Sequence, residues 1–153
     1  MTHLCCDVLN RLAGKTLATA ESCTGGGIGA ALTAIPGSSA VYKGGIISYT
    51  NEIKHDLLGV EYGLLDTQGA VSAPVAEAMA VGARKALKTD VAVSVTGLAG
   101  PGGDDFGNPV GRVYIGYADE RRTLHREFTF SGGREEVRDQ AAREALKLIL
   151  ELN

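Results

Sequence analysis

Cysteine and histidine are scarce in this sequence, and long apolar runs are absent. The three cysteines, Cys5, Cys6 and Cys23, form no CxxC pair, so a shared metal site is not expected. An odd cysteine count without a secretory signal favours a reducing cytoplasm and free thiols. No apolar run approaches the roughly 18–20 residues needed to span a bilayer. We therefore expect a cytoplasmic protein with no membrane contact.

An excess of either charge is also missing. The formal net charge of the 153 residues is −3, which gives no reason to expect a nucleic-acid partner. A short basic run, Arg121-Arg122 with His125 and Arg126, is typical of the solvated edge of a hairpin. Apolar residues make up 44% and charged residues 22% of the chain, as in ordinary globular proteins. The length predicts one domain over residues 1–153.

Helical and strand patterns alternate along the chain. Helices are expected over 4–12, 24–34, 51–58, 73–88 and 134–152, and strands over 16–21, 43–50, 91–96, 112–118 and 123–130. The run "VAVSVT" is typical of a buried central parallel strand, whereas the last two strands flank a turn and predict an antiparallel hairpin. This order favours an α/β fold, a three-layer α/β/α sandwich with a mixed sheet of about five strands.

Unusually polar segments follow three of these strands. They are "ESCTGG" from Glu21, "YTN" with Lys54 close behind, and Thr96-Gly97 with a long glycine-rich loop. In open α/β sheets, ligands bind beyond the carboxyl ends of the strands. Three polar ends together predict one composite site.

Ser22 has two interpretations. A strand-to-helix turn favours a serine as helix cap, but Thr24 could serve as the cap and leave the Ser22 hydroxyl free as a nucleophile beside backbone N–H groups. Cys23 is a rival nucleophile, because a helix N-terminus lowers the pKa of a thiol. No histidine follows a strand in a matching position, so neither a Cys-His pair nor a Ser-His-Asp triad is well supported.

Lysine is then the remaining candidate base. Lys54 is expected in the first turn of a short helix, where the helix dipole disfavours the ammonium form, and burial could lower its pKa further. It could equally be an ordinary surface lysine. Tyr49, five residues earlier, could position a proton or simply lie at the edge of the core.

The glycines raise a nucleotide-binding alternative. Gly25, Gly27 and Ala30 match a G-x-G-x-x-G/A fingerprint, but Glu52 is poorly placed as its ribose-binding acid. A single phosphate on a helix N-terminus is the better version of this interpretation. Arg134 could add positive charge, or it could pair with a neighbouring glutamate. The loop that begins at Gly97 and contains Gly100, Gly102 and Gly103 could also bring backbone close to a ligand.

With these residues in view, the sequence resembles the CinA C-terminal domain family, the nicotinamide-nucleotide amidases. The motifs that carry the resemblance are "ATAESCTGG", "IPGSSAVYKGGIISYTNEIKHDLLGV", "GAVS", "VSVTGLAGPGG", "NPVGRVYIG" and "FSGGREEVR". They extend over residues 4–152. "AESCTGG" together with "TGLAGP" is highly specific. Larger relatives carry an N-terminal domain with pyrophosphatase activity, which we do not expect here.

The resemblance implies a three-layer α/β/α fold and hydrolysis of nicotinamide mononucleotide to nicotinate mononucleotide and ammonia. It implies a serine–lysine hydrolase without metal or cofactor, with Ser22 as nucleophile, Lys54 as base and Tyr49 assisting. Substrate contacts are expected from Thr24, Gly25, Gly26, Thr96, Gly97, Gly100 and Arg134. Backbone N–H groups from Cys23 to Gly26 would receive the oxyanion. Members are usually oligomeric, so a homo-oligomer is expected.

Two other hypotheses remain open from the sequence. A nucleotide-binding module without turnover would use the same glycine-rich loops and would tolerate loss of Lys54. A redox-sensing protein would depend on Cys23 and not on Ser22.

Overall fold

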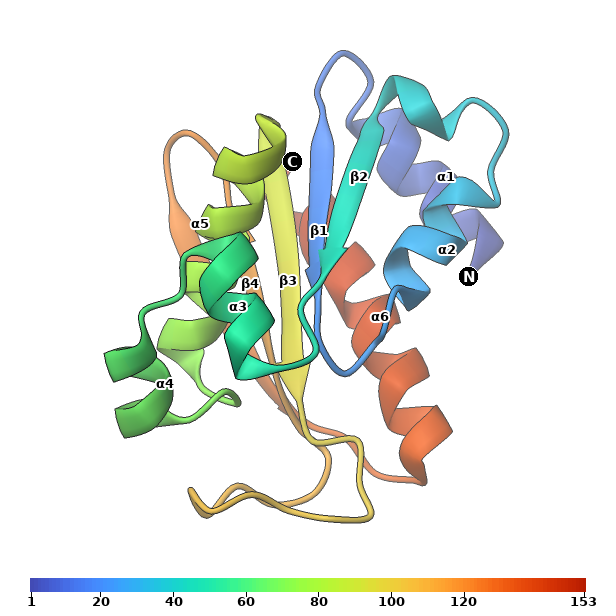
Figure 1. Ribbon diagram of the computed structural model, residues 1–153. Coiled ribbons are helices and arrows are strands. Elements are labelled where there is room, and N and C mark those ends of the chain that lie inside the picture. The colour runs from blue at the N-terminus through green and yellow to red at the C-terminus, as the bar shows by residue number, and fades with distance from the viewer.

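A five-stranded mixed sheet forms the centre of the protein (Figure 1). The computed structural model describes residues 1–153, and the strands lie in the order β2-β1-β3-β4-β5. Their bounds are β1 Leu17–Glu21, β2 Tyr42–Ile47, β3 Val91–Gly97, β4 Arg112–Ala118 and β5 Thr123–Thr129. The strands β1, β2 and β3 are parallel, while β4 is antiparallel to both β3 and β5. The expected mixed sheet with one terminal hairpin is confirmed.

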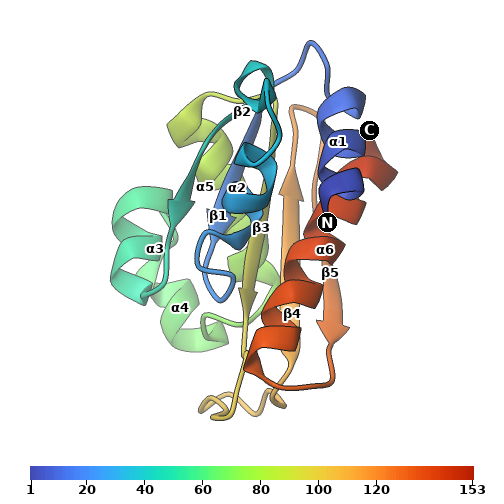
Figure 2. The same cartoon turned by 90° about the vertical axis from the view of Figure 1, so that its right-hand side faces the viewer.

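Helices cover both faces of the sheet (Figures 1 and 2). One face carries α1 Thr2–Arg11, α2 Gly27–Thr33 and α6 Arg134–Leu152, and the other carries α3 Asn51–Leu58, α4 Tyr62–Gln68 and α5 Ala73–Leu87. A short 3-10 helix, Ser38–Ala40, precedes β2. Side chains alternate across β1, so Leu17 joins the larger core under α1, α2 and α6, and Ala18 joins the smaller core under α3, α4 and α5. The three-layer sandwich is therefore confirmed.

The structure differs from the sequence expectation most clearly in α2, β2 and α4. Helix α2 begins at Gly27 rather than at Thr24, because Gly25 and Gly26 have positive φ angles of 58° and 97°, which interrupt a helix. Strand β2 ends at Ile47 and not at residue 50, and Thr50 caps α3 by accepting from the Ile53 N–H. Helix α4 was not expected, since its seven residues show too little apolar periodicity to be recognised.

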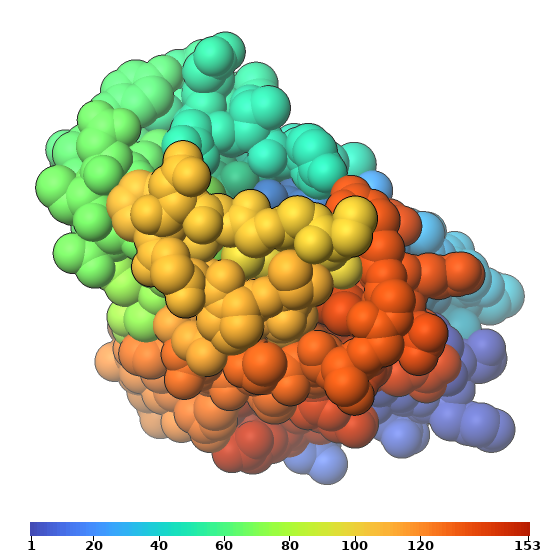
Figure 3. All heavy atoms as spheres, turned by 90° about the horizontal axis from the view of Figure 1, so that it is seen from below, coloured from blue at the N-terminus to red at the C-terminus, as the bar shows by residue number.

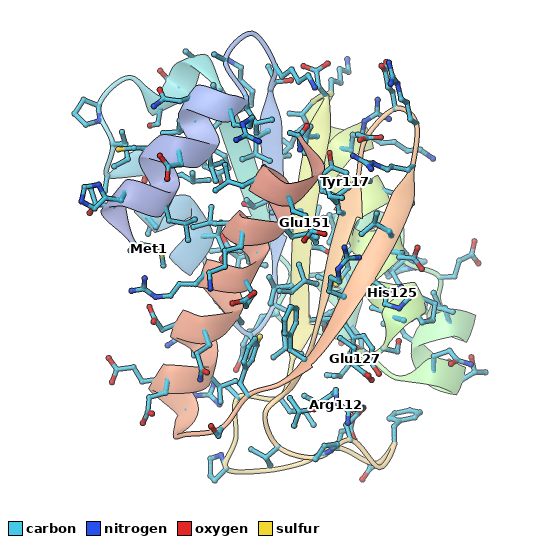
Figure 4. All side chains as sticks on the ribbon, turned by 180° about the vertical axis from the view of Figure 1, so that it is seen from behind. Met1, Arg112, Tyr117, His125, Glu127 and Glu151 are labelled. Carbon is cyan, nitrogen blue, oxygen red and sulfur yellow. The ribbon has the colours of Figure 1, made fainter.

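The β4–β5 hairpin carries the basic run at an exposed edge of the sheet. Arg122 pairs with Asp119, and Arg126 pairs with Glu151 on α6. Figure 4 shows His125, Glu127 and Arg112 along the two hairpin strands, where Arg112 and Glu127 form a 2.9 Å ion pair. These pairs are typical of a solvated surface.

No helix in the structure combines the length and the hydropathy that a membrane span requires.

We predict that Gly116 is required for the close approach of α5 to β4. A methyl group at this position would overlap the backbone carbonyl of Ala76 on α5, so Gly116→Ala should lower the free energy of unfolding by roughly 1–3 kcal/mol. Gly63→Ala in α4 is the matched control, because no atom lies within 4 Å of its added methyl group. It should be neutral or slightly stabilising. Equal unfolding midpoints for the two variants in urea would contradict this packing.

Candidate functional site

A cavity of about 630 Å³ opens at the carboxyl ends of the three parallel strands. Seen from this end, the loop 97–111 lies across the molecule between α3 and the start of α6 (Figure 3). The volume is in the range of small-molecule sites. The lining comes from all three polar strand ends named above, from the segment between α4 and α5, and from α6: Ser22, Cys23, Tyr49, Asn51, Lys54, Ala70, Val71, Thr96 to Phe106, and Arg134. The expectation of a composite site at this edge agrees with the geometry.

Ser22 is the first residue beyond β1. Its backbone N–H donates to the Val95 carbonyl on β3 at 2.9 Å, which continues the sheet ladder and fixes the backbone at this position. The residue is 7% exposed and lines the cavity. The Ser22 hydroxyl therefore extends from a rigid strand end into the cavity, as a nucleophile requires.

Lys54 lies on α3 and is 1% exposed, so it is not the surface lysine that its position also allowed. Its Nζ lies 2.9 Å from Ser22 Oγ and 2.8 Å from the Ser48 carbonyl oxygen, with the Tyr49 carbonyl oxygen at 3.5 Å. No carboxylate is among these partners. The amine is thus buried without an anionic partner, directly against the Ser22 hydroxyl.

Burial lowers the pKa of the Lys54 ammonium from 10.5 to about 8, because removal from water penalises the charged form. In the neutral amine, Nζ has two N–H bonds and one lone pair. The carbonyl groups of Ser48 and Tyr49 can only accept hydrogen bonds, so they take the N–H bonds. The lone pair is then left for the Ser22 O–H. This arrangement can remove a proton from Ser22 near neutral pH.

Tyr49 and Arg134 meet at the mouth of the cavity. Arg134 Nη2 donates to the Tyr49 hydroxyl at 3.1 Å, and Nη1 donates to the Gly100 carbonyl at 2.8 Å. Arg134 therefore forms no ion pair with Glu135 or Glu136, which was the alternative that the sequence left open. The Tyr49 hydroxyl points to the guanidinium, so Tyr49 reaches the Lys54 amine only through its backbone carbonyl.

The other predicted contact residues divide into two groups. Thr96, Gly97 and Gly100 line the cavity, although the Thr96 hydroxyl donates to the Ala70 carbonyl at 2.8 Å and so also fixes the wall. Thr24, Gly25 and Gly26 do not line it. Thr24 is buried with its hydroxyl turned away to a carboxylate.

That carboxylate belongs to Glu21, a residue whose role the sequence analysis missed. Glu21 is 2% exposed and accepts from the Thr24 hydroxyl at 2.7 Å and from the backbone N–H groups of Ile28 and Gly29 at 2.9 and 3.0 Å. It therefore caps α2 from the end of β1. The N-terminus of α2 is filled by this carboxylate and is not a free phosphate site. Only the polarity of Glu21 within a buried strand could have indicated this role.

Cys23 is poorly suited to act as the nucleophile. Burial raises the pKa of its thiol to about 11, which outweighs the lowering that a helix N-terminus was expected to produce. No histidine lies at the cavity. His55 stacks on Tyr62, and His125 on β5 lies beside Glu77 of α5.

A second missed feature is the internal bracing of the loop 97–111. Asp104 accepts from the backbone N–H groups of Phe106 and Asn108. Burial acts to raise the pKa of its carboxyl group, but hydrogen bonds from the Asn108 side chain and from these backbone groups outweigh it, so the pKa is lowered. The Asn108 amide donates to Asp104 at 2.8 Å and to the Val71 carbonyl at 3.0 Å. The loop is thereby fastened to the segment between α4 and α5 across the cavity.

Comparison with known proteins agrees with the geometry and the motifs. The model of the CinA C-terminal domain matches residues 3–153. The chain belongs to the CinA C-terminal domain family. A CinA-like protein of Thermosynechococcus vestitus is 53% identical over 138 residues, which are 88% of this chain and 33% of that protein. A CinA-like protein of Geobacter sp. is 51% identical over 86% of this chain and 32% of its own length. The chain spans about a third of the length of the curated relatives it matches.

Solved structures of CinA proteins have the same fold. The crystal structure of a CinA superfamily protein from Escherichia coli superposes with a TM-score of 0.97 at 34% identity and covers 99% of this chain and 90% of that one. A competence/damage inducible protein from Agrobacterium tumefaciens gives a TM-score of 0.95 at 42% identity, over 99% and 94% of the two chains. The CinA fold thus accounts for nearly every residue of the chain.

We predict that the buried Glu21 carboxylate stabilises the fold. Glu21→Gln replaces an acceptor oxygen by an NH₂ donor that faces N–H and O–H donors, so at least one buried donor loses its partner. The free energy of unfolding should fall by about 1–3 kcal/mol. Glu120→Gln on the exposed hairpin turn is the control and should change it by less than about 0.5 kcal/mol. Urea unfolding of both variants measures the difference, and a Glu21→Gln midpoint equal to that of the control would contradict the prediction.

Proposed function

We propose that this chain hydrolyses the carboxamide of nicotinamide mononucleotide to nicotinate mononucleotide and ammonia through Ser22 and Lys54. The observation that carries the proposal is the buried Lys54 amine, 2.9 Å from the Ser22 hydroxyl, with a pKa lowered to about 8. A serine activated by a neutral lysine is suited to acyl transfer. Membership of the CinA C-terminal domain family supports the nucleotide amide as substrate.

In the first half-reaction, the neutral Lys54 amine takes the proton of Ser22 while Oγ attacks the carboxamide carbon. The carbonyl π electrons move to the oxygen and give a tetrahedral oxyanion. When the intermediate collapses, the C–N bond breaks and the Lys54 ammonium returns its proton to the departing amide nitrogen. Ammonia leaves, and Ser22 carries the rest of the mononucleotide as an ester through its carboxamide carbon.

In the second half-reaction, Lys54 takes a proton from water, and the hydroxide attacks the ester carbonyl. Collapse of this second tetrahedral intermediate breaks the bond to Oγ, and the Lys54 ammonium protonates Ser22. The carboxylate product then leaves. Throughout, the carbonyl groups of Ser48 and Tyr49 hold the amine in one orientation.

The substrate phosphate is assigned to the cavity mouth. Arg134 is the cation there, and its two contacts with Tyr49 and Gly100 keep its guanidinium at the rim. A planar guanidinium binds phosphate with two parallel hydrogen bonds. Backbone N–H groups of the glycine-rich segment Gly97–Gly103 add further donors in this proposal.

The decisive experiment is ammonia release from nicotinamide mononucleotide by the purified chain. Ser22→Ala and Lys54→Met should each reduce turnover by at least about 10³-fold, because they remove the nucleophile and its base. Lys85→Met, which removes an exposed lysine on α5, should leave turnover unchanged. Substrate binding without ammonia release by the wild type would favour a non-hydrolytic nucleotide-binding module. Turnover that survives Ser22→Ala but not Cys23→Ser would exclude the serine mechanism.

The pH dependence should report the Lys54 amine. Only the neutral form can accept the Ser22 proton, so kcat/KM should rise about tenfold per pH unit below a pKa of about 8 and level off above it. The rate at saturating and at low substrate, measured between pH 6 and pH 10, tests this. An apparent pKa at or above 10 would contradict the burial of the amine in the working enzyme.

A further inference from the structure

Arg138 on α6 contacts residues 22–26, the nucleophile turn, from outside the cavity. Its Nε donates to the Cys23 carbonyl at 2.9 Å, and its Nη2 donates to the Thr24 carbonyl at 3.3 Å. The side chain is partly buried and does not line the cavity. The guanidinium thus holds the Cys23–Thr24 and Thr24–Gly25 peptide groups from outside the cavity.

These contacts fix the direction of a backbone donor. In a trans peptide, the carbonyl of one residue and the N–H of the next point in opposite directions. Because the Cys23 carbonyl points to Arg138, the Thr24 N–H points away from it, and that N–H donates to no oxygen of the chain. The Ser22 carbonyl accepts from the Gly25 N–H at 3.1 Å, so the Cys23 N–H is directed away from that bond and is also unpaired.

We propose that Arg138 is a positioning residue for the oxyanion hole, because it orients the Cys23–Thr24 peptide so that the Thr24 N–H, next to the N–H of Cys23, faces the oxyanion formed at Ser22. This inference rests on the proposed acyl transfer at Ser22. The Gly25 N–H was also a candidate oxyanion donor, but it already donates to the Ser22 carbonyl. The hole then contains the two donors nearest to the nucleophile.

The chemistry of arginine suits this role. A guanidinium stays charged at all working pH values and presents its donors in a rigid fork, which matches two neighbouring carbonyl groups. A positive charge at the Cys23 carbonyl polarises the Cys23–Thr24 peptide and strengthens the Thr24 N–H as a donor. Glycine at position 25 leaves room for this contact, because a Cβ there would lie 3.3 Å from Arg138 Nη2. Its φ of 58° also favours glycine at this position.

The test compares Arg138→Met and Arg138→Lys with Arg143→Met. Arg143 lies on the same helix and pairs only with Asp139 on the surface. We expect Arg138→Met to lower kcat for nicotinamide mononucleotide by about 10- to 100-fold, with KM changed less than about threefold, because donors to the oxyanion act in the transition state. Arg138→Lys should restore part of kcat, and Arg143→Met should behave as the wild type.

A second readout does not depend on the substrate. A fluorophosphonate forms a bond from Ser22 Oγ to phosphorus with loss of fluoride while Lys54 takes the Ser22 proton, and its phosphoryl oxygen uses the same donors. The labelling rate, with Ser22→Ala as the blank, should fall in Arg138→Met in parallel with kcat. The apparent pKa of the labelling rate should stay near that of the wild type, since Arg138 does not contact the Lys54 amine.

The outcomes separate the two proposals. A wild type that is labelled at Ser22 but releases no ammonia contradicts the proposed substrate, and the labelling rates then decide the role of Arg138. Labelling and kcat of Arg138→Met equal to those of Arg143→Met would overturn the inference, as would a change confined to KM. If Arg138→Met does not fold, Arg138→Gln takes its place with the same expected and contradicting results. A wild type with neither labelling nor turnover contradicts both proposals.

Discussion

The burial of one amine against one hydroxyl is the constraint on which the site depends. Lys54 Nζ reaches Ser22 Oγ only because α3 begins directly after β2, which lies beside β1 in a parallel pair. The Ser48 carbonyl, at the end of β2, holds the amine on its other side. Removal of the ammonium from water costs free energy and lowers its pKa to about 8. The same burial therefore gives the amine its position and its basicity.

Two side chains of opposite charge, the buried Glu21 and the partly buried Arg138, hold the nucleophile turn from different sides. Glu21 takes the N–H groups at the start of α2 and the Thr24 hydroxyl, while Arg138 takes the carbonyl groups of Cys23 and Thr24. Glu21 satisfies two N–H groups at the start of α2, and Arg138 gives the Cys23 carbonyl a partner. These contacts add to the turn's own hydrogen bonds, from the Gly25 N–H to the Ser22 carbonyl and from the Gly27 N–H to the Thr24 carbonyl.

Much of the fold and part of the site could be predicted from the sequence. Strand and helix periodicity gave every strand and five of the six helices, and polar strand ends pointed to Ser22, Lys54 and Thr96. Helix α4 is too short for its periodicity to be read, and the double glycine shifted the start of α2. Glu21 and Arg138 were missed because their partners are backbone groups, and a sequence does not reveal which backbone groups lack partners.

The sequence by itself determined which residue types follow each strand, and so which edge of the sheet holds the site and which family the motifs match. Only the tertiary structure decided between the alternatives at each position. Whether Lys54 is a surface ammonium or a buried amine depends on how it packs against Ser22, which lies 32 residues away in the sequence. Whether the N-terminus of α2 binds a phosphate depends on Glu21 reaching it first. Protonation state and donor availability are properties of the surroundings in space, and these are set by contacts between segments distant in the chain.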